Sequence, residues 1–157
     1  MIKSRLLWVG RENKRDPESQ LCERYLGRIQ PFFKLEQVVF RGRQDSKPET
    51  VLEKEGDKIL AALEPTDFLV VCDERGKLLS SKQLADLVDE RERAAAGRLV
   101  WLIGGAHGLD PRVRQRANFM LSLSPMTLPH ALARVILLEQ IYRACCIRSG
   151  FPYHHEG

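Results

Sequence analysis

Two short segments without polar side chains constrain the fold of this chain most. Residues 68–72 (Phe-Leu-Val-Val-Cys) and 99–103 (Leu-Val-Trp-Leu-Ile) are continuous apolar runs, and each is bounded by turn residues and helical patterns. Strands with apolar side chains on both faces are typical of a parallel sheet that is covered by helices on both sides. The sequence therefore predicts an α/β fold with a mostly parallel sheet and helices on both faces.

The remaining elements alternate around these two runs. Further strands are expected at residues 6–9, 35–40 and 119–123, where apolar and β-branched residues cluster. The expected helices begin with a proline, serine or aspartate cap at residues 16–18, 46–49, 80–81 and 110–111, and the last begins at residue 130. Alternation of strands and helices indicates one α/β unit.

Three local details complete this prediction. The strand at 68–72 is expected to end at Asp73, with a turn at residues 74–76. Gly56 is a weak point within the second helix, where it costs about 1 kcal/mol relative to alanine. Gly150 is expected to end the last helix, which begins at His130.

Length and composition limit the class of protein. The 157 residues contain no internal repeat, low-complexity tract or linker, so we predict a single domain over residues 1–157. The chain has no apolar run of membrane-spanning length and no signal-peptide pattern, which predicts a cytoplasmic protein that does not bind membranes. The four cysteines are not spaced as metal ligands, and we expect them to be reduced and to bind no metal.

The charge is unevenly distributed along the chain. The net charge of +4 divides into +5 for residues 1–47, −5 for residues 48–97 and +4 for residues 98–157, where every basic residue is an arginine. The planar guanidinium pairs with phosphate and stacks on bases, so this pattern favours a nucleic-acid or nucleotide partner. A solvated surface with chance segregation of charge explains it about as well.

A binding site is expected where the central strands end. In open α/β sheets ligands bind at the carboxyl ends of the strands, which here are marked by Cys72-Asp73, by Gly104-Gly105 and by residues 123–125. The glycines would allow the backbone to approach a ligand closely, although a structural turn also accounts for them. The loop at 104–108 is neither a Walker loop nor a dinucleotide fingerprint, which disfavours a dehydrogenase.

The last helix and the tail suggest a second surface. The helix is apolar nearly all round, which favours a homodimer interface, although burial within one subunit stays open. Glu139 and Arg143 stand four residues apart and could form a plain ion pair. Tyr153 and His154 could serve in acid–base chemistry or stacking, or belong to a frayed end. Metal binding by His154 and His155 is less favoured.

Four segments in order resemble the RlmH family, bacterial methyltransferases of the SPOUT superfamily that act on large-subunit ribosomal RNA. They are residues 102–108 (Leu-Ile-Gly-Gly-Ala-His-Gly), 123–130 (Leu-Ser-Pro-Met-Thr-Leu-Pro-His), 141–144 (Ile-Tyr-Arg-Ala) and 152–154 (Pro-Tyr-His). Each motif is modest by itself, and the resemblance covers the whole chain, including its length. It implies a C-terminal trefoil knot, an exception to the rule that chains avoid knots.

The resemblance also implies a reaction and a site. It implies a homodimer that uses S-adenosylmethionine to methylate N3 of a pseudouridine in 23S rRNA of assembled ribosomes. The catalytic residues would be Arg143, which could stabilise the uracil anion, Tyr153, and His154 as the candidate base. The implied cofactor-binding residues are Cys72, Gly104, Gly105, Leu123, Ser124, Pro125, Met126, Thr127 and Leu128.

Three residues depart from the family pattern. Cys72 stands where a larger aliphatic residue is common, His107 is unusual in the glycine loop, and His155 replaces a frequent arginine. The last change bears on the affinity for RNA. Two alternatives to the leading function are a SPOUT methyltransferase for another rRNA or tRNA base and a non-catalytic RNA-binding dimer.

Overall fold

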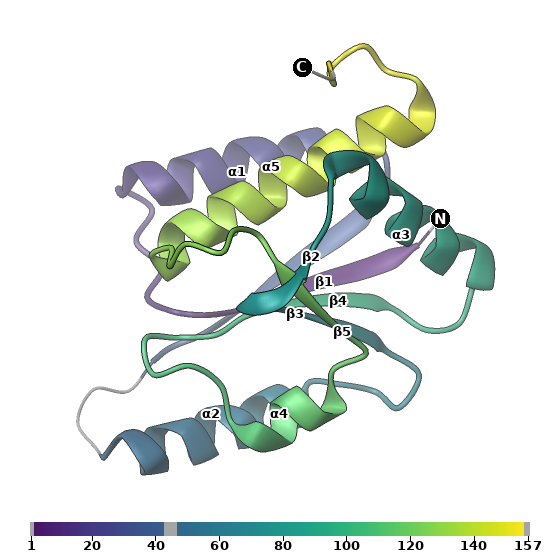
Figure 1. Cartoon of the computed structure of the whole chain (residues 1–157). Coiled ribbons are helices and arrows are strands. Elements are labelled where there is room, and N and C mark those ends of the chain that lie inside the picture. Colours follow the sequence, from purple (N-terminus) through teal and green to yellow (C-terminus); the bar gives the residue numbers. More distant parts are fainter. Residues whose placement is uncertain (1, 43–46, 156–157) are drawn as a thin grey trace.

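Five strands form one parallel sheet in the computed structural model, which describes residues 2–42 and 47–155 (Figure 1). The strand order is β2-β1-β4-β3-β5, and every neighbouring pair is parallel. The strands are β1 (Lys3–Val9), β2 (Lys34–Phe40), β3 (Phe68–Leu78), β4 (Leu99–Ile103) and β5 (Phe119–Ser122). The predicted α/β fold with a parallel sheet is confirmed.

Helices cover both faces of this sheet. They are α1 (Pro17–Ile29), α2 (Pro48–Ala61), α3 (Ser81–Ala94), α4 (Pro111–Arg116) and α5 (His130–Ser149). Figure 1 shows α1, α3 and α5 on one face and α2 and α4 on the other. A parallel connection needs a crossover, so each strand is followed by a helix that packs back onto the sheet.

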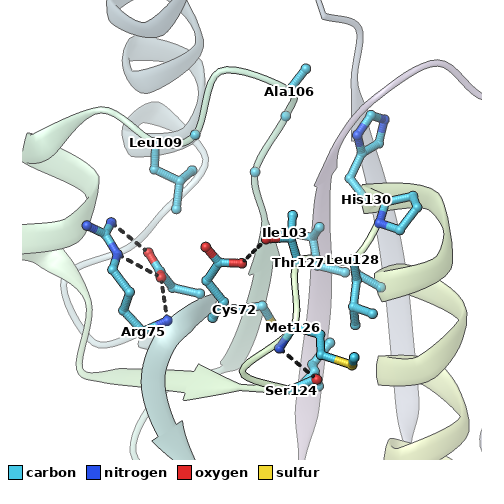
Figure 2. A pocket seen from close by; sticks show the side chains of 18 of the residues that line it. Cys72, Arg75, Ile103, Ala106, Leu109, Ser124, Met126, Thr127, Leu128 and His130 are labelled. Carbon is cyan, nitrogen blue, oxygen red and sulfur yellow. Dashed lines mark hydrogen bonds and ion pairs between the residues drawn. The ribbon is translucent and has the colours of Figure 1, made fainter.

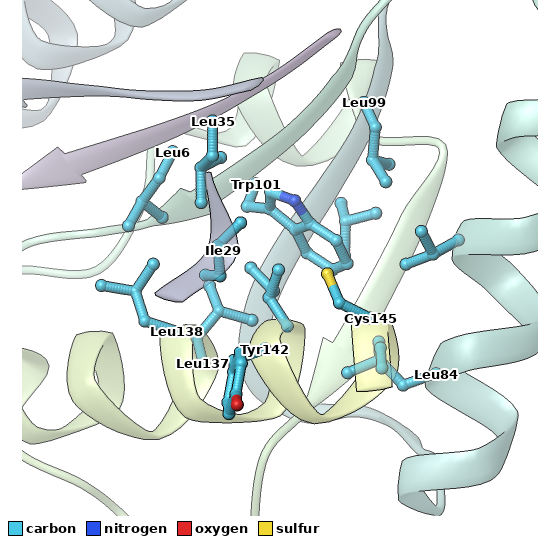
Figure 3. Packing of buried hydrophobic residues seen from close by; sticks show 14 of the residues in the cluster. Leu6, Ile29, Leu35, Leu84, Leu99, Trp101, Leu137, Leu138, Tyr142 and Cys145 are labelled. Atoms are coloured by element: carbon cyan, nitrogen blue, oxygen red, sulfur yellow. The ribbon is translucent and has the colours of Figure 1, made fainter. Parts of the chain in front are cut away.

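The two central strands are buried on both faces, as their composition predicts. Along β4, Trp101 faces the cluster under α1, α3 and α5, and Leu102 faces the smaller cluster under α2 and α4. Trp101 packs among Leu137 and Cys145 of α5 (Figure 3). Full burial of such side chains is worth about 1.5–3 kcal/mol each, which fixes the face on which each helix lies.

Side-chain caps begin α3 and α4 as expected. Ser80, rather than Ser81, caps α3, and it forms a reciprocal capping box with Gln83. The Asp110 carboxylate accepts a hydrogen bond from the backbone N–H of Arg112 at the start of α4. Gly150 ends α5 with φ +73°. For α2, residue 46 lies outside the described residues and the helix begins at Pro48.

The predicted end of the third strand is wrong. β3 does not stop at Asp73, and the expected turn at residues 74–76 is strand that continues to Leu78. β5 pairs with both halves of β3, because its Leu121 lies opposite Cys72 and again opposite Lys77 across a register shift. Gly76 permits this contact, since a Cβ there would lie 2.6 Å from the carbonyl oxygen of Met120.

Gly56 is not the weak point that helix propensity suggests. It is buried, and any Cβ at this position would overlap the Asp110 carboxylate that caps α4. The glycine therefore lets α2 approach the start of α4. Tertiary packing overrides the propensity cost here.

The last helix is buried within one subunit to a large extent. Leu137, Leu138, Ile141 and Cys145 are fully buried against the sheet and the neighbouring helices α1 and α3. The apolar residues on this side of α5 are therefore explained by burial within one subunit and do not require a dimer interface. Leu132, by contrast, is 43% exposed, and an apolar stripe continues over Val135 and Ile136, which are partly exposed.

Candidate functional site

A cavity of about 510 Å³ opens where β4 and β5 end and where β3 changes register (Figure 2). Most of its walls come from residues within three segments that are far apart in the sequence, 72–75, 103–109 and 123–130, and Arg114 and Ala133 complete the lining. This is the edge of the sheet at which parallel α/β proteins bind ligands. We call this cavity the strand-end pocket.

Eight of the nine residues predicted to bind a cofactor line this pocket. They are Cys72, Gly104, Gly105, Leu123, Ser124, Met126, Thr127 and Leu128. The ninth, Pro125, is exposed and lies outside the pocket lining. Its neighbours on both sides line the pocket because the backbone turns at this point, where the Ser124 hydroxyl accepts a hydrogen bond from the N–H of Met126.

The glycine loop brings its backbone to the pocket surface. A Cβ on Gly104 would lie 2.8 Å from Leu109 Cδ2, and one on Gly105 would lie 3.0 Å from Val9 Cγ1. Gly108, with φ +84°, donates a backbone hydrogen bond of 3.1 Å to the carbonyl oxygen of Gly105. The glycines thus close a tight turn and also leave amide and carbonyl groups facing the cavity.

Sequence reasoning marked Asp73 at a strand end but missed its two arginine partners, and the three residues form a charged wall of the pocket. Asp73 accepts hydrogen bonds from the backbone N–H of Arg75, at 2.9 Å, and from its side chain, and forms an ion pair with Arg114. Burial alone would raise the pKa of Asp73, but the hydrogen bonds from both arginines outweigh it and lower the pKa to about 2. The sequence signal for Asp73 was its place directly after the apolar run at residues 68–72, whereas its pairing with Arg114 joins segments that are distant in the sequence.

A hydrogen bond connects the two sides of this pocket. Thr127 Oγ1 donates to Glu74 Oε2 at 2.7 Å, which links the second half of β3 to the loop after β5 (Figure 2). His130, the first residue of α5, was also missed, and its ring stands 5.9 Å from that of Trp8. The position of His130 depends on how α5 packs, which no local pattern indicates.

Apolar atoms form much of the remaining surface. Leu109, Leu128 and Met126 line the cavity, and Met126 is 75% exposed at its edge. Burial raises the pKa of the Cys72 thiol to about 12, so it is a protonated, apolar part of the wall. Backbone polar groups with apolar walls suit a flat heteroaromatic ligand.

The three predicted catalytic residues lie together, but they do not line this pocket. Arg143 Nη1 lies 3.1 Å from His154 Nδ1, and the guanidinium carbon is 4.7 Å from the centre of the Tyr153 ring. Glu139 connects them, since its Oε1 accepts from Arg143 Nη2 at 2.5 Å and from the Tyr153 hydroxyl at 3.1 Å. We call Glu139, Arg143, Tyr153 and His154 the tail cluster.

The tail is ordered by packing as well as by these polar contacts. The Tyr153 ring meets the Tyr142 ring edge-on at 4.7 Å, which ties the tail to α5. Burial, together with the hydrogen bond to Glu139, raises the pKa of Tyr153 to about 12. The ion pair between Glu139 and Arg143 that their spacing allowed is present, and it is part of the tail cluster.

The described residues, 2–42 and 47–155, contain neither a metal-binding cluster nor a membrane-spanning helix. They hold no group of three or more His, Cys, Asp or Glu side chains that could bind a metal ion. Within the same residues, every helix is too short or too polar to cross a membrane. The four cysteines are free thiols.

The parallel sheet, its strand-end pocket and the polar tail now define a class of protein. The family described as "Predicted SPOUT methyltransferase" matches residues 2–154, so the chain belongs to the SPOUT methyltransferases. The C-terminal trefoil knot is implied by this membership. A solved structure, "Crystal Structure of Probable Methyltransferase from Bordetella pertussis Tohama I", shares the fold, with a TM-score of 0.58, 16% identity, and coverage of 92% of this chain and 95% of that one.

Several relatives within the family carry the same name. The chain is 52% identical to "Ribosomal RNA large subunit methyltransferase H" of Desulfovibrio desulfuricans, over 83% of this chain and 84% of the relative. It is 41% identical to the protein of that name from Nitratidesulfovibrio vulgaris, over 99% of this chain and 100% of the relative. The RlmH resemblance seen in the sequence motifs is confirmed.

Proposed function

We propose that this chain methylates N3 of a pseudouridine in 23S rRNA, at the position conventionally numbered 1915, on assembled ribosomes. The observation that carries the proposal is the strand-end pocket, which joins three distant segments that include eight of the nine predicted cofactor residues. The relatives that match nearly the whole chain are named for methylation of large-subunit ribosomal RNA. An rRNA substrate also agrees with the net charge of +4.

S-adenosylmethionine fits the strand-end pocket. The backbone at Gly104 and Gly105 would meet the adenine edge, where a Cβ would crowd Leu109 and Val9. Leu128 and Met126 would cover the apolar faces of the cofactor. When bound, the cofactor supplies a methyl group made electrophilic by the neighbouring sulfonium. The protein's contribution is to align that methyl group with the attacking nitrogen.

The active form in this proposal is a homodimer. The tail cluster lies outside the pocket lining of its own subunit, so the tail of a second subunit would complete the site. The surface for this contact is the apolar stripe of Leu132, which is 43% exposed, continued by Val135 and Ile136. Exposed apolar stripes of this kind mark protein interfaces.

In such a dimer the tail cluster would face the target base. Arg143 would neutralise charge that develops on the base, and Tyr153, whose hydroxyl already donates to Glu139, would stack against it. His154 would contact the reacting edge of the uracil. The protein would work in the cytoplasm, where assembled ribosomes are found.

Methylation of ribosomes tests this function directly. Purified protein and labelled S-adenosylmethionine are added to ribosomes from a strain that lacks the endogenous enzyme, and the label in 23S rRNA is mapped by mass spectrometry. We expect one N3-methyl mark, on the stem-loop pseudouridine. Label on another RNA would refute the substrate, and cofactor binding without any label would favour a non-catalytic dimer.

A further inference from the structure

We propose that His154 acts as a hydrogen-bond donor through Nε2 and that the tail cluster stabilises an anionic base instead of removing its proton. The inference rests on the proposed function and deepens it, because it names the chemical role of this cluster. It replaces the expectation from the sequence that His154 is the base. The argument depends on which atoms of the cluster already accept hydrogen bonds.

The orientation of His154 follows from its neighbour. Arg143 Nη1 lies 3.1 Å from His154 Nδ1. A guanidinium is always charged and has only donors, so the Nδ1 lone pair accepts this hydrogen bond. A neutral imidazole that accepts at Nδ1 carries its proton at Nε2. A proton on Nδ1 would point at a guanidinium N–H, so this contact selects the tautomer with a bare Nδ1.

The other candidate bases in the cluster are engaged as well. Glu139 Oε1 accepts from Arg143 Nε at 3.0 Å, from Arg143 Nη2 and from the Tyr153 hydroxyl, and Glu139 Oε2 accepts from Gln140 Nε2 at 2.8 Å. Gln140 is itself fixed by the Ser81 hydroxyl, which donates to its Oε1 at 2.6 Å. The Glu139 carboxylate is therefore a structural acceptor that holds Arg143 and Tyr153 in place.

The cluster instead presents donors. Arg143 uses three of its five N–H groups in the bonds described, which leaves one N–H on each Nη nitrogen. With the Nε2–H of His154, these groups could bond the two carbonyl oxygens that flank N3 of a uracil ring. Charge from an N3 anion spreads onto both oxygens, and preorganised donors at such positions stabilise developing charge strongly.

The proton then leaves without a protein base. The N3–H bond breaks, its electron pair stays on the nitrogen as the attacking lone pair, and the proton passes to water. His154 and Arg143 keep their own protons throughout. This proton transfer needs only water as the acceptor. The cluster then acts as an oxyanion hole does, because it stabilises the negative charge that develops on the base.

The tautomer of His154 can be measured without any activity. Long-range proton–nitrogen NMR spectra of protein with labelled histidine distinguish a protonated ring nitrogen from a bare one, and the His154 signals are assigned by their loss in a His154→Asn variant. We expect a protonated Nε2 and a bare Nδ1 at neutral pH. Arg143→Met should weaken this preference and let the Nδ1–H form become more populated, because the donor to Nδ1 is lost. A protonated Nδ1 in the unmodified protein would overturn the proposal.

Activity supplies the second readout. A glutamine amide can donate a hydrogen bond near the position of Nε2 but cannot act as a base, so we expect His154→Gln to retain turnover within about tenfold on ribosomes. His154→Ala should lose about 100-fold. Equal loss in both variants, with rescue of His154→Ala by added imidazole, would show that His154 is a base. If the unmodified protein methylates no ribosome, the proposed function fails, whereas the NMR result still decides the tautomer.

Discussion

The strand-end pocket and the tail cluster are built by different means. The pocket is shaped by backbone, since Gly104 and Gly105 leave no room for a Cβ, and its position follows from the register of β3, β4 and β5. The tail cluster is shaped by side chains, which are held through hydrogen bonds to one carboxylate, Glu139. Cofactor binding in the pocket should therefore be weakened by added side-chain atoms, and the function of the cluster should be weakened by the loss of a single polar atom.

The largest expected effect comes from Arg143→Met. The change removes the donors that would face the base in the proposed mechanism, so turnover on ribosomes should fall by about 100- to 1,000-fold. Affinity for S-adenosylmethionine, measured by calorimetry, should stay within about twofold, because Arg143 does not line the pocket of its own subunit. Arg148→Met is the matched control five residues further along α5, where the arginine pairs with Asp89. A comparable loss in both variants would contradict the assignment.

Gly104→Ala tests the backbone wall. The added methyl group would lie 2.8 Å from Leu109 Cδ2 and 3.1 Å from the carbonyl oxygen of Gly108, so the loop must shift. Overpacking of this kind costs about 1–3 kcal/mol, and we expect calorimetric affinity for the cofactor to fall about tenfold. Gly27→Ala is the control, since nothing lies within 4 Å of a Cβ there. Unchanged affinity in Gly104→Ala would refute a cofactor site at this loop.

Asp73 should make the free energy of unfolding depend on pH in the acid range. The hydrogen bonds from Arg75 and Arg114 outweigh burial and lower its pKa to about 2, below the ordinary value of 3.8. Its stabilisation of the folded state is therefore present above pH 4 and lost as the pH falls from about 4 to about 2. We expect a loss of about 1–2 kcal/mol in the free energy of unfolding over this range, measured by urea denaturation.

Asp73→Asn is the corresponding variant. It should be less stable than the unmodified protein at pH 7 and should lose less stability between pH 4 and pH 2. Parallel stability curves for the two proteins across that range would show that Asp73 does not contribute the effect.

The smallest effect is expected from Cys72→Ala. The thiol is a protonated, apolar part of the wall, with a pKa raised by burial to about 12. Removing it should change cofactor affinity by less than about threefold, a much smaller change than at Gly104. The same thiol should resist alkylation at pH 7, because only the thiolate reacts. A tenfold loss of affinity would mean that this side chain, and not only its backbone, binds the cofactor.

Much of the fold could be read from local patterns. Strands that are apolar on both faces predicted the central β3 and β4, and proline or serine signals placed the starts of the helices. The two errors have one kind of cause. β3 runs past Asp73 because β5 pairs with it twice, and Gly56 is needed because α4 begins against it. Both contacts join segments that are distant in the sequence.

The candidate site divides in the same way. Glycines and strand ends indicated the region of the pocket, because both are local features of the sequence that show where the backbone turns. The Asp73–Arg114 ion pair, the Glu74–Thr127 hydrogen bond and the place of His130 could not be anticipated, since each depends on the packing of separate segments. The spacing of Glu139 and Arg143 predicted their ion pair but not its links to the tail.

The sequence by itself determined the parallel α/β fold, the family and the segments that meet at the pocket. These properties follow from periodicity, from glycine and proline geometry and from motifs, all of which are local along the chain. Only the tertiary structure decided that the tail cluster stands apart from the strand-end pocket and that His154 accepts a hydrogen bond at Nδ1. The direction of a hydrogen bond depends on which side chains folding brings together, and no one-dimensional pattern contains that information.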